Sequence, residues 1–509
     1  MSIKWNAAIA AGLFTLAVTT GMPKVSAQEP ARIPEIQQLM QRLENAESQI
    51  GQLQNQLQQT EGAAVVQVPS NSSGIEQVGA TDSKELERIK NLESNVDKIL
   101  GRFSKGTNWI SPGHSGSTMK VFGRIHADYW SFPEDSDGVR AFEGGDPQSR
   151  IGFRRMRIGV KGDIKDNMFY KIEVDFAARN RTAFKDAYLG FKDIPFFQKV
   201  IIGQQKRPYG LDTLNSSRYN VFIERPFVVE ALNQDARRFG IASHGVSEDL
   251  AWNWQYGFYN QRDLATQVND INDHFQGQFA GRLANTIWYD ESSGGRGYAH
   301  WAISGTVANS DGNSPNNGTQ DNETRFRTRP EARTSGRWLN TGRIAGAKSY
   351  EILAAEAVVN VGSVQAVGEF MNVWVQRESV AGEDVQFYGA YGYVSWFLTG
   401  EHIPWNRKTG TIGRVKPFQN FFLVDTCDDC KGRGWGAWQV AARYSYSDFS
   451  DADILGGKGE SLTIGVNWHW NPYARMQFNY IDGRISNRSV NGQTAGNYQV
   501  LGVRMMVDF

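Results

Sequence analysis

Alternation of apolar and polar residues with period two dominates this chain from about residue 118 to its end. In the last strand-like segment, one face carries Leu501, Val503, Met505, Val507 and Phe509, and the other carries Gly502, Arg504, Met506 and Asp508. Two faces of this kind suit lipid on one side and water on the other. A half-buried strand of a soluble sheet shows the same alternation, so the choice depends on the rest of the chain.

The same pattern returns in many other segments. Near the start of this region, Phe122, Arg124, His126, Asp128 and Trp130 alternate with Val121, Gly123, Ile125, Ala127 and Tyr129. Comparable strands are predicted at 155–161, 170–176, 438–446, 462–470 and 474–480. Aromatic residues recur near the predicted strand ends, and long polar stretches such as 305–348 separate some strands. The pattern predicts an all-β transmembrane antiparallel barrel with aromatic girdles and long loops at one end.

The amino-terminal residues predict export. Lys4 precedes an apolar stretch from Ala7 to Val18, and Val25-Ser26-Ala27 has the small residues of a cleavage site, so residues 1–27 are predicted to be a signal peptide. The alternative is an uncleaved amino-terminal anchor. After residue 27, no uninterrupted apolar run approaches the ~20 residues that a spanning helix needs. The 53 glycines and the 15 Trp, 18 Tyr and 28 Phe residues also suit a barrel.

Residues 28–105 have a different, helical periodicity. Apolar residues follow a 3-4 spacing at Ile36, Leu39, Leu43, Ala46, Ile50, Leu53 and Leu57, and again at Ile89, Leu92, Val96 and Ile99. This spacing predicts an α-helical coiled coil in the periplasm that assembles copies of the chain. The alternative is an amphipathic helix that packs on its own protein. The spacing leaves the choice between two and three strands open.

Several segments resemble the phosphate-selective porin O and P family. They include 184–190, 203–211 (GQQKRPYGL), 216–225, 237–241, 397–402 (FLTGEH), 465–468 and 478–480. The resemblance covers residues 118–509. It implies an outer-membrane barrel of about sixteen strands, an assembly of three copies, a loop folded into the pore and basic residues along the permeation path.

Basic residues are the candidate binding groups for an anion. Phosphate that sheds water needs replacement donors, and the arginine guanidinium offers a planar fork of them. The predicted pore-lining residues are Arg124, Arg155, Arg157, Lys206, Arg207, Arg218, Arg225, Arg237, Arg238, Arg443, Arg475 and Arg504, and alternation places Lys161 on the same side. The alternative is that these side chains pair with carboxylates such as Asp128, Glu173, Asp175 and Glu369 to brace the barrel. Glu224 and Arg225 are a second candidate structural pair.

The two cysteines, Cys427 and Cys430, predict a short loop disulfide in an exported protein. A metal site is the alternative, although the neighbouring sequence supplies no further ligands. The chain has no G-x-S-x-G motif and its 7 histidines form no cluster with ligand spacing, so we predict no enzyme activity, no metal and no cofactor. The formal net charge is zero, and no nucleic-acid partner is predicted.

These observations predict a passive outer-membrane porin for small anions, with phosphate or related oxyanions as solutes and outer-membrane lipid around it. Residues 106–509 would form the barrel, and the coiled coil would lie in the periplasm near peptidoglycan. Two alternatives remain open. One is a structural anchor that connects the barrel to the cell wall, and the other is a non-selective general porin or a cation-preferring channel.

Overall fold

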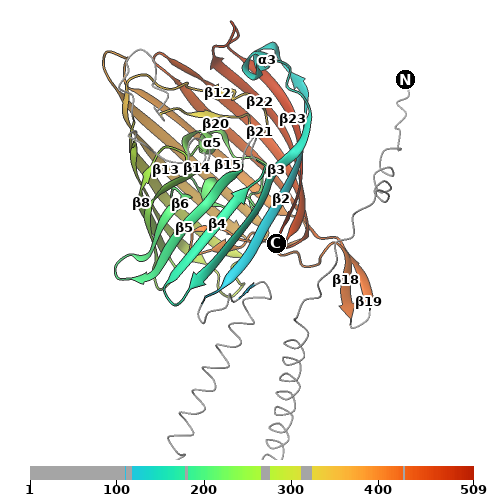
Figure 1. Cartoon of the computed structure of the whole chain (residues 1–509). Coiled ribbons are helices and arrows are strands. Elements are labelled where there is room, and N and C mark those ends of the chain that lie inside the picture. Colours follow the sequence, from blue (N-terminus) through green and yellow to red (C-terminus); the bar gives the residue numbers. More distant parts are fainter. Residues whose placement is uncertain are drawn as a thin grey trace, which may run out of the picture. The chain divides into compact units, whose positions relative to one another are not determined.

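Consecutive strands pair around a closed antiparallel sheet (Figure 1). The computed structural model describes residues 109–110, 117–177, 182–234, 236–264, 275–310, 324–427 and 430–509. The predicted signal peptide and coiled coil lie outside these ranges. Among the residues that the structure describes, no helix has the length and apolar character needed to cross a membrane.

The main sheet has 17 strands, of which the two-residue β1 (Trp109–Ile110) only extends the edge of β2, so 16 close the barrel. These are β2 (Met119–Asp135), β3 (Arg150–Ile164), β4 (Met168–Asp175), β5 (Ala183–Ile194), β6 (Gln198–Lys206), β7 (Arg237–Val246), β8 (Trp252–Asn260), β9 (Gly277–Tyr289), β10 (Gly297–Asn309), β13 (Ala347–Val361), β14 (Val364–Arg377), β15 (Val385–Phe397), β20 (Ala437–Asp451), β21 (Ile454–Asn471), β22 (Ala474–Arg488) and β23 (Gly496–Asp508).

The last strand closes the barrel. β23 pairs with β2, with Asp508 opposite Arg124. The backbone of Phe509 then exchanges two hydrogen bonds with Gly123, at 3.0 and 3.2 Å. A Cβ atom at Gly123 would come within 2.8 Å of the backbone oxygen of Arg157 and within 2.3 Å of the Phe509 ring, so a larger residue at this position would disturb the seam.

Alternation sorts the side chains into two environments. In β2, Arg124, His126 and Asp128 are buried in the lumen, whereas Ile125 and Tyr129 are exposed on the outer wall. Exposed Ile, Leu, Val, Phe and Trp residues continue around the other strands. Soluble monomers rarely expose apolar surface on this scale, whereas lipid covers it in a membrane barrel.

The connections at the two ends of the barrel differ in length. Six of the seven connections at one end, which we call the turn end, are short; the tight β13–β14 turn, for example, uses Gly362 at φ +59°. Phe509 also lies at the turn end, because an even number of strands returns the chain to the end where β2 begins. The opposite, loop end carries α3 (Asp137–Glu143) and most of the longer connections.

Three connections enter the lumen. The inner loop (residues 207–236, between β6 and β7) contains α4 (Leu211–Leu214) and α5 (Phe227–Leu232). The upper segment (324–346, between β10 and β13) contains β11 (Arg327–Thr328) and β12 (Leu339–Asn340). The lower segment (398–415, after β15) enters from the turn end and contains β16 (Trp405–Asn406) and β17 (Thr411–Ile412). The chain then forms the β18 (Phe422–Cys427) and β19 (Cys430–Gly434) hairpin.

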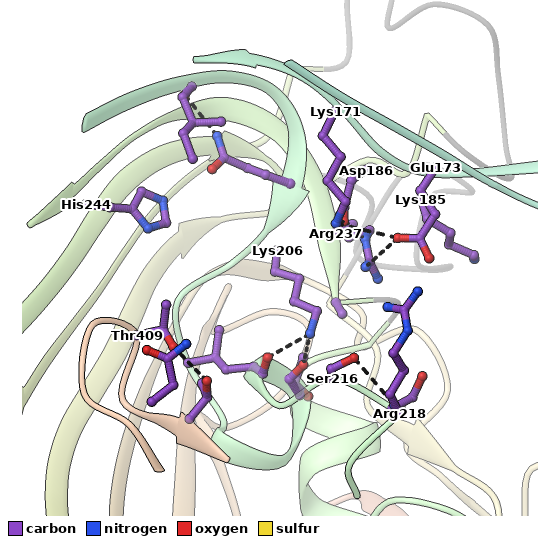
Figure 2. A pocket seen from close by; sticks show the side chains of 18 of the residues that line it. Lys171, Glu173, Lys185, Asp186, Lys206, Ser216, Arg218, Arg237, His244 and Thr409 are labelled. Carbon is purple, nitrogen blue, oxygen red and sulfur yellow. Dashed lines mark hydrogen bonds and ion pairs between the residues drawn. The ribbon is translucent and has the colours of Figure 1, made fainter. Parts of the chain in front are cut away.

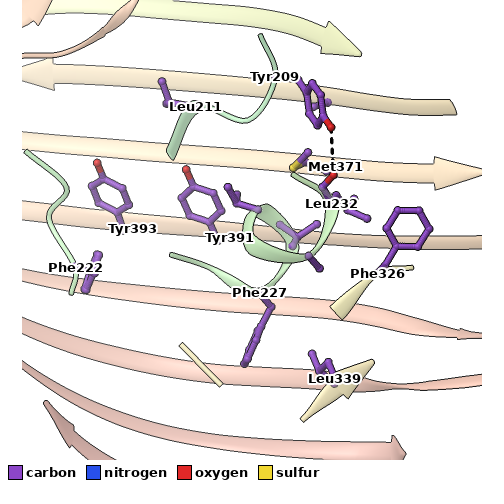
Figure 3. Packing of buried hydrophobic residues seen from close by; sticks show 14 of the residues in the cluster. Tyr209, Leu211, Phe222, Phe227, Leu232, Phe326, Leu339, Met371, Tyr391 and Tyr393 are labelled. Atoms are coloured by element: carbon purple, nitrogen blue, oxygen red, sulfur yellow. Dashed lines mark hydrogen bonds between the residues drawn. The ribbon is translucent and has the colours of Figure 1, made fainter. Parts of the chain in front are cut away.

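Part of the lumen is filled by an apolar core. Phe227, Val228 and Val229 of α5 have no solvent exposure and belong to one buried cluster with Leu339 of β12 and Tyr391 of β15 (Figure 3). Burial of this apolar surface stabilises the folded position of the inner loop at roughly 25 cal/mol per Å². The inner loop is therefore a packed element of the barrel.

Candidate functional site

A cavity of about 940 Å³ occupies the part of the lumen that the apolar core leaves open. Strands β2–β7 form its wall, and the inner loop and residues 406–414 of the lower segment face that wall. Figure 2 shows Lys171, Asp186 and Arg237 close together on the wall, with Lys206 turned towards the inner loop and Thr409 on the lower segment.

The cavity continues towards the turn end. A second cavity of about 620 Å³ shares Lys161, Lys171, Arg218 and Arg414 with the first and is also lined by Lys120 and Phe509. Because Phe509 lies at the turn end, the two cavities together lead along the β2–β7 wall towards that end of the barrel.

Positive charge dominates the main cavity. Its lining contains 15 basic residues and 5 carboxylates, a formal excess of ten positive charges. The basic residues are Arg124, Arg154, Arg155, Arg157, Lys161, Lys171, Lys185, Lys192, Lys199, Lys206, Arg218, Arg225, Arg237, Lys408 and Arg414. The carboxylates are Asp163, Glu173, Asp186, Glu224 and Glu230. The whole chain is formally neutral, so the excess results from placement.

A β-bulge adds one of these arginines. In the β2–β3 ladder, His126 lies opposite Arg155 and Ala127 lies opposite Phe153, so Arg154 has no partner position. The extra residue breaks strict alternation, and both Arg154 and Arg155 line the cavity. Alternation by itself predicts only Arg155. The adjacent pair Arg154-Arg155 is visible in the sequence, but only the pairing of β2 with β3 shows the bulge that brings both side chains to the cavity.

Two carboxylates neutralise part of the wall. Glu173 has no exposed side-chain surface and lies 2.5 Å from Arg124 and 3.5 Å from Arg157. Asp186 forms ion pairs with both Lys171 and Arg237. These groups form a braced network in which each carboxylate holds two or more basic side chains, as the bracing alternative expected.

Other basic groups on the cavity wall lack such partners. In the described ranges, no carboxylate lies within 4 Å of the charged groups of Arg155, Lys161, Lys199 or Lys408. The guanidinium of Arg155 contacts the ring of His126 at 3.3 Å, and its Nε atom is buried without a hydrogen-bond acceptor. These four side chains can therefore offer positive charge to a solute.

Lys206 also lines the cavity, but its ammonium donors are occupied. Its Nζ donates to the backbone oxygens of Thr213, Leu214 and Asn215 at 2.5, 2.9 and 3.1 Å. A lysine has three such donors, so Lys206 fastens the end of α4 to the barrel and keeps only its charge for the cavity.

Glu224 anchors the inner loop to two strands. Its carboxylate accepts two hydrogen bonds from Arg154, at 2.7 and 3.1 Å, and one from Arg504 at 2.8 Å. Burial favours the neutral acid, but Arg154, Arg504 and Arg155 hold the pKa of Glu224 well below its usual value. The alternative pairing of Glu224 with Arg225 is wrong in detail, because Arg225 lies 3.4 Å from Asp212 instead.

Seven of the twelve predicted pore-lining residues meet in this cavity: Arg124, Arg155, Arg157, Lys206, Arg218, Arg225 and Arg237. The other five, Arg207, Arg238, Arg443, Arg475 and Arg504, lie outside its lining. Arg443, Arg475 and Arg504 are buried and donate to the inner-loop carbonyl oxygens of Glu224, Asn220 and Ile223.

Arg207 and Arg238 also make internal contacts. Arg207 donates to Gln278 at 3.1 Å and to Asn233 at 3.0 Å, and Arg238 donates to the backbone oxygens of Gln261 and Arg237. Like Arg443, Arg475 and Arg504, these two residues therefore stabilise the barrel and its loops. The sequence had predicted that all five line the pore. Alternation cannot separate these roles, because both require a side chain that points inward.

The sequence prediction did not include the lower segment in the site. Lys408 and Arg414 reach the cavity because the lower segment folds inward from the turn end. In the upper segment, burial lowers the pKa of Arg333, and Arg154 acts in the same direction while Glu224 opposes it, but the cavity lining contains no described residue of this segment. The basic residues Lys408 and Arg414 themselves were the visible signal in the sequence.

The cysteine pair lies in the β18–β19 hairpin. The backbone pairs Cys427 with Cys430, but the side chains of both lie outside what the structure describes, so the disulfide stays a prediction. Among the described ranges, no group of three or more His, Cys, Asp or Glu residues is arranged to hold a metal ion.

Comparison with known proteins identifies the family. The model of the phosphate-selective porin O and P family matches residues 119–509. The chain belongs to this family. The match covers the whole described barrel from β2 to Phe509, as the resemblance predicted. Membership in this porin family, together with a closed 16-strand barrel, makes the chain an outer-membrane porin, and its architecture is that of a channel.

The chain is also similar to individual proteins. An uncharacterised protein from Caulobacter vibrioides is 25% identical over 370 residues, which cover 70% of this chain and 68% of the relative. The channel DcaP of Acinetobacter baumannii has 11% identity and a TM-score of 0.47, and covers 78% of this chain and 99% of its own. An anion-selective porin from Comamonas acidovorans has 12% identity and a TM-score of 0.45, with 77% and 99% covered.

Proposed function

We propose that this porin conducts small anions passively through the cationic cavity, with inorganic phosphate or related oxyanions as its solutes. The observation that carries the proposal is the excess of ten positive charges in the lining of the main cavity. Family membership agrees with it, because the family is described as phosphate-selective.

The donor chemistry supports an oxyanion. Phosphate that enters a narrow passage loses part of its hydration, and guanidinium and ammonium groups replace water with charged donors. Among the described residues, no carboxylate lies within 4 Å of the charged groups of Arg155, Lys161 and Lys199, which therefore supply charge that no ion pair neutralises. At an effective dielectric constant near 20, one charge pair at 4 Å contributes about 4 kcal/mol.

Several such sites favour flux over trapping. A single strong site would hold the ion, whereas a series of weaker sites lets the ion move from one to the next. The paired groups help here, because Glu173 and Asp186 reduce the positive potential near Arg124 and Lys171. We therefore propose passive movement along the β2–β7 wall.

Planar-bilayer recording tests this function directly. In a gradient of potassium chloride, the reversal potential of the wild-type channel should lie towards the chloride equilibrium potential, and added phosphate should reduce the chloride current. A reversal potential on the cation side would overturn anion conduction. Anion preference without block by phosphate would leave a general anion porin, and absence of current would favour the structural anchor.

We also propose that three copies assemble and that the turn end faces the periplasm. Both termini of the barrel lie at the turn end, so a coiled coil at 28–105 that precedes the barrel would start from that side. The resemblance to the porin family implies an assembly of three copies. Native mass spectrometry of the full chain and of a variant that lacks residues 28–105 would give the copy number and the contribution of the coiled coil. A monomer in both cases would contradict the proposal.

A further inference from the structure

Glu331 of the upper segment connects three separate parts of the lumen. Its side chain has no solvent exposure. One carboxylate oxygen accepts the backbone N–H of Phe227, the first residue of α5, at 3.2 Å. Through this bond the upper segment holds the inner loop at the point where α5 begins.

The other carboxylate oxygen binds the barrel wall. It accepts hydrogen bonds from the guanidinium of Arg443 at 2.7 Å and from the hydroxyls of Ser461 at 2.9 Å and Thr463 at 3.3 Å. Arg443 lies on β20, and Ser461 and Thr463 lie on β21. The single carboxylate therefore ties the inner loop to two wall strands, and charge-assisted hydrogen bonds of this kind are among the stronger ones in proteins.

The backbone of Glu331 is held in an unusual conformation. Its φ of +56° lies in the left-handed region, which costs free energy for a residue other than glycine. Such a conformation persists where surrounding contacts impose it, and here the four hydrogen bonds to the carboxylate do so.

A second contact of the upper segment acts on the same helix. Glu230 of α5 accepts hydrogen bonds from Arg337 at 2.8 Å and from the Thr328 hydroxyl at 3.1 Å. Phe227 and Leu232 belong to the apolar cluster, in which Phe227 lies near Leu339 (Figure 3). Because Glu224 and Glu230 both line the cavity, the position of this part of the inner loop limits the space left along the charged wall.

We propose that Glu331 is a positioning residue for permeation, which sets the width and the anion preference of the cavity by holding the inner loop against β20 and β21. The part that concerns anion preference rests on the proposed function, whereas the part that concerns width does not. Glu331 itself does not line the cavity, so it acts on the solute through the position of the loop.

The test compares Glu331→Gln with Glu356→Gln by single-channel recording. Glu356 is a matched control, because it is also buried and bound to an arginine, Arg282, but it lies on β13 outside the cavity lining. Circular dichroism and the heat-dependent gel mobility of each barrel select folded protein. We expect the conductance of Glu331→Gln to rise at least about twofold and its reversal potential to move towards zero. Glu356→Gln should retain wild-type values of both.

A milder variant tests the same contact if Glu331→Gln does not fold. Ser461→Ala removes one hydroxyl donor to the same carboxylate oxygen and leaves the charge of Arg443 paired. It should change conductance in the same direction by a smaller factor. Wild-type conductance and reversal potential in folded Glu331→Gln would overturn the inference. If Glu331→Gln does not fold, wild-type values of both in Ser461→Ala would overturn it. A wild-type reversal potential on the cation side would refute the proposed function alone.

Discussion

The two sides of the lumen are built by the same alternation and differ in almost every other respect. On the charged wall (β2–β7), inward residues such as Arg157 and Asp186 border an open cavity. On the apolar wall (β13, β14 and β15), inward residues such as Ile352, Met371 and Phe387 are buried in a core with the inner loop and the upper segment.

The difference shows how a wide barrel can form a narrow path. Apolar inward residues give the loops a surface on which to bury their own apolar side chains, and that burial favours a fixed loop position. Inward charges resist desolvation and keep their side of the lumen wet. The apolar wall therefore holds the loops, and the charged wall retains the cavity.

The largest expected effect comes from the apolar wall. Phe227→Ala removes a ring with no solvent exposure from the core and should lower the free energy of unfolding by about 3–5 kcal/mol, because it leaves a cavity. Urea unfolding in lipid vesicles, followed by tryptophan fluorescence, measures this loss. The control is Phe239→Ala, whose ring is exposed on the outer wall. Equal losses in the two variants would mean that the core does not hold the inner loop.

The next effect concerns the charged wall. Glu173→Gln removes a carboxylate that lies near Arg124 and Arg157, so the cavity becomes more positive. We expect a loss of about 1–3 kcal/mol in stability and a reversal potential closer to the chloride equilibrium potential. Glu356→Gln removes a similar carboxylate outside the cavity and should leave the reversal potential unchanged. A shift towards the cation side in Glu173→Gln would contradict the charge argument.

A smaller effect is expected from one arginine without a carboxylate partner. Arg155→Gln should weaken phosphate block of the chloride current about tenfold, which corresponds to about 1.4 kcal/mol, because one charged donor is lost. The apparent dissociation constant from a phosphate titration measures this change. Arg377→Gln is the control, since Arg377 is also buried but pairs with Asp453 away from the cavity. Unchanged block in Arg155→Gln would remove this residue from the proposed path.

The smallest effect is expected from mild acid. The pKa of Glu224 is depressed in the folded protein, so its contribution to stability is present above its unfolded pKa of about 4.3 and is lost only as the pH falls through the lower folded value. The link from Glu224 to Arg154 and Arg504 should thus persist from pH 7 to about pH 5. Conductance recorded over this range should stay constant. A change in conductance between pH 7 and about pH 5 that disappears in Glu224→Gln would contradict the depressed pKa of Glu224.

Much of the barrel could be predicted from the residue pattern. Lipid accepts one kind of side chain and the lumen another, so strict alternation in segments such as 121–130 identified strand faces correctly. Strand number came from the family resemblance, because alternation in separate segments does not count the strands between them.

The site was harder to predict, for three physical reasons. Arg154 enters the lumen through a bulge, and a bulge depends on the pairing with β2. Lys408 and Arg414 enter on a segment whose inward fold depends on tertiary contacts, such as the one between Ile412 and Asn215. The third reason is that an inward arginine such as Arg443 has the same sequence pattern whether it meets solvent or a loop carbonyl.

The sequence by itself determined the membrane barrel and the faces of its strands, because those follow from the solvents on the two sides and from a period of two. Only the tertiary structure decided which inward charges share a cavity. That choice depends on where the inner loop, the upper segment and the lower segment fold in the lumen. Their apolar side chains pack against the apolar wall, because excluding water there costs less desolvation free energy than excluding it from the charged wall.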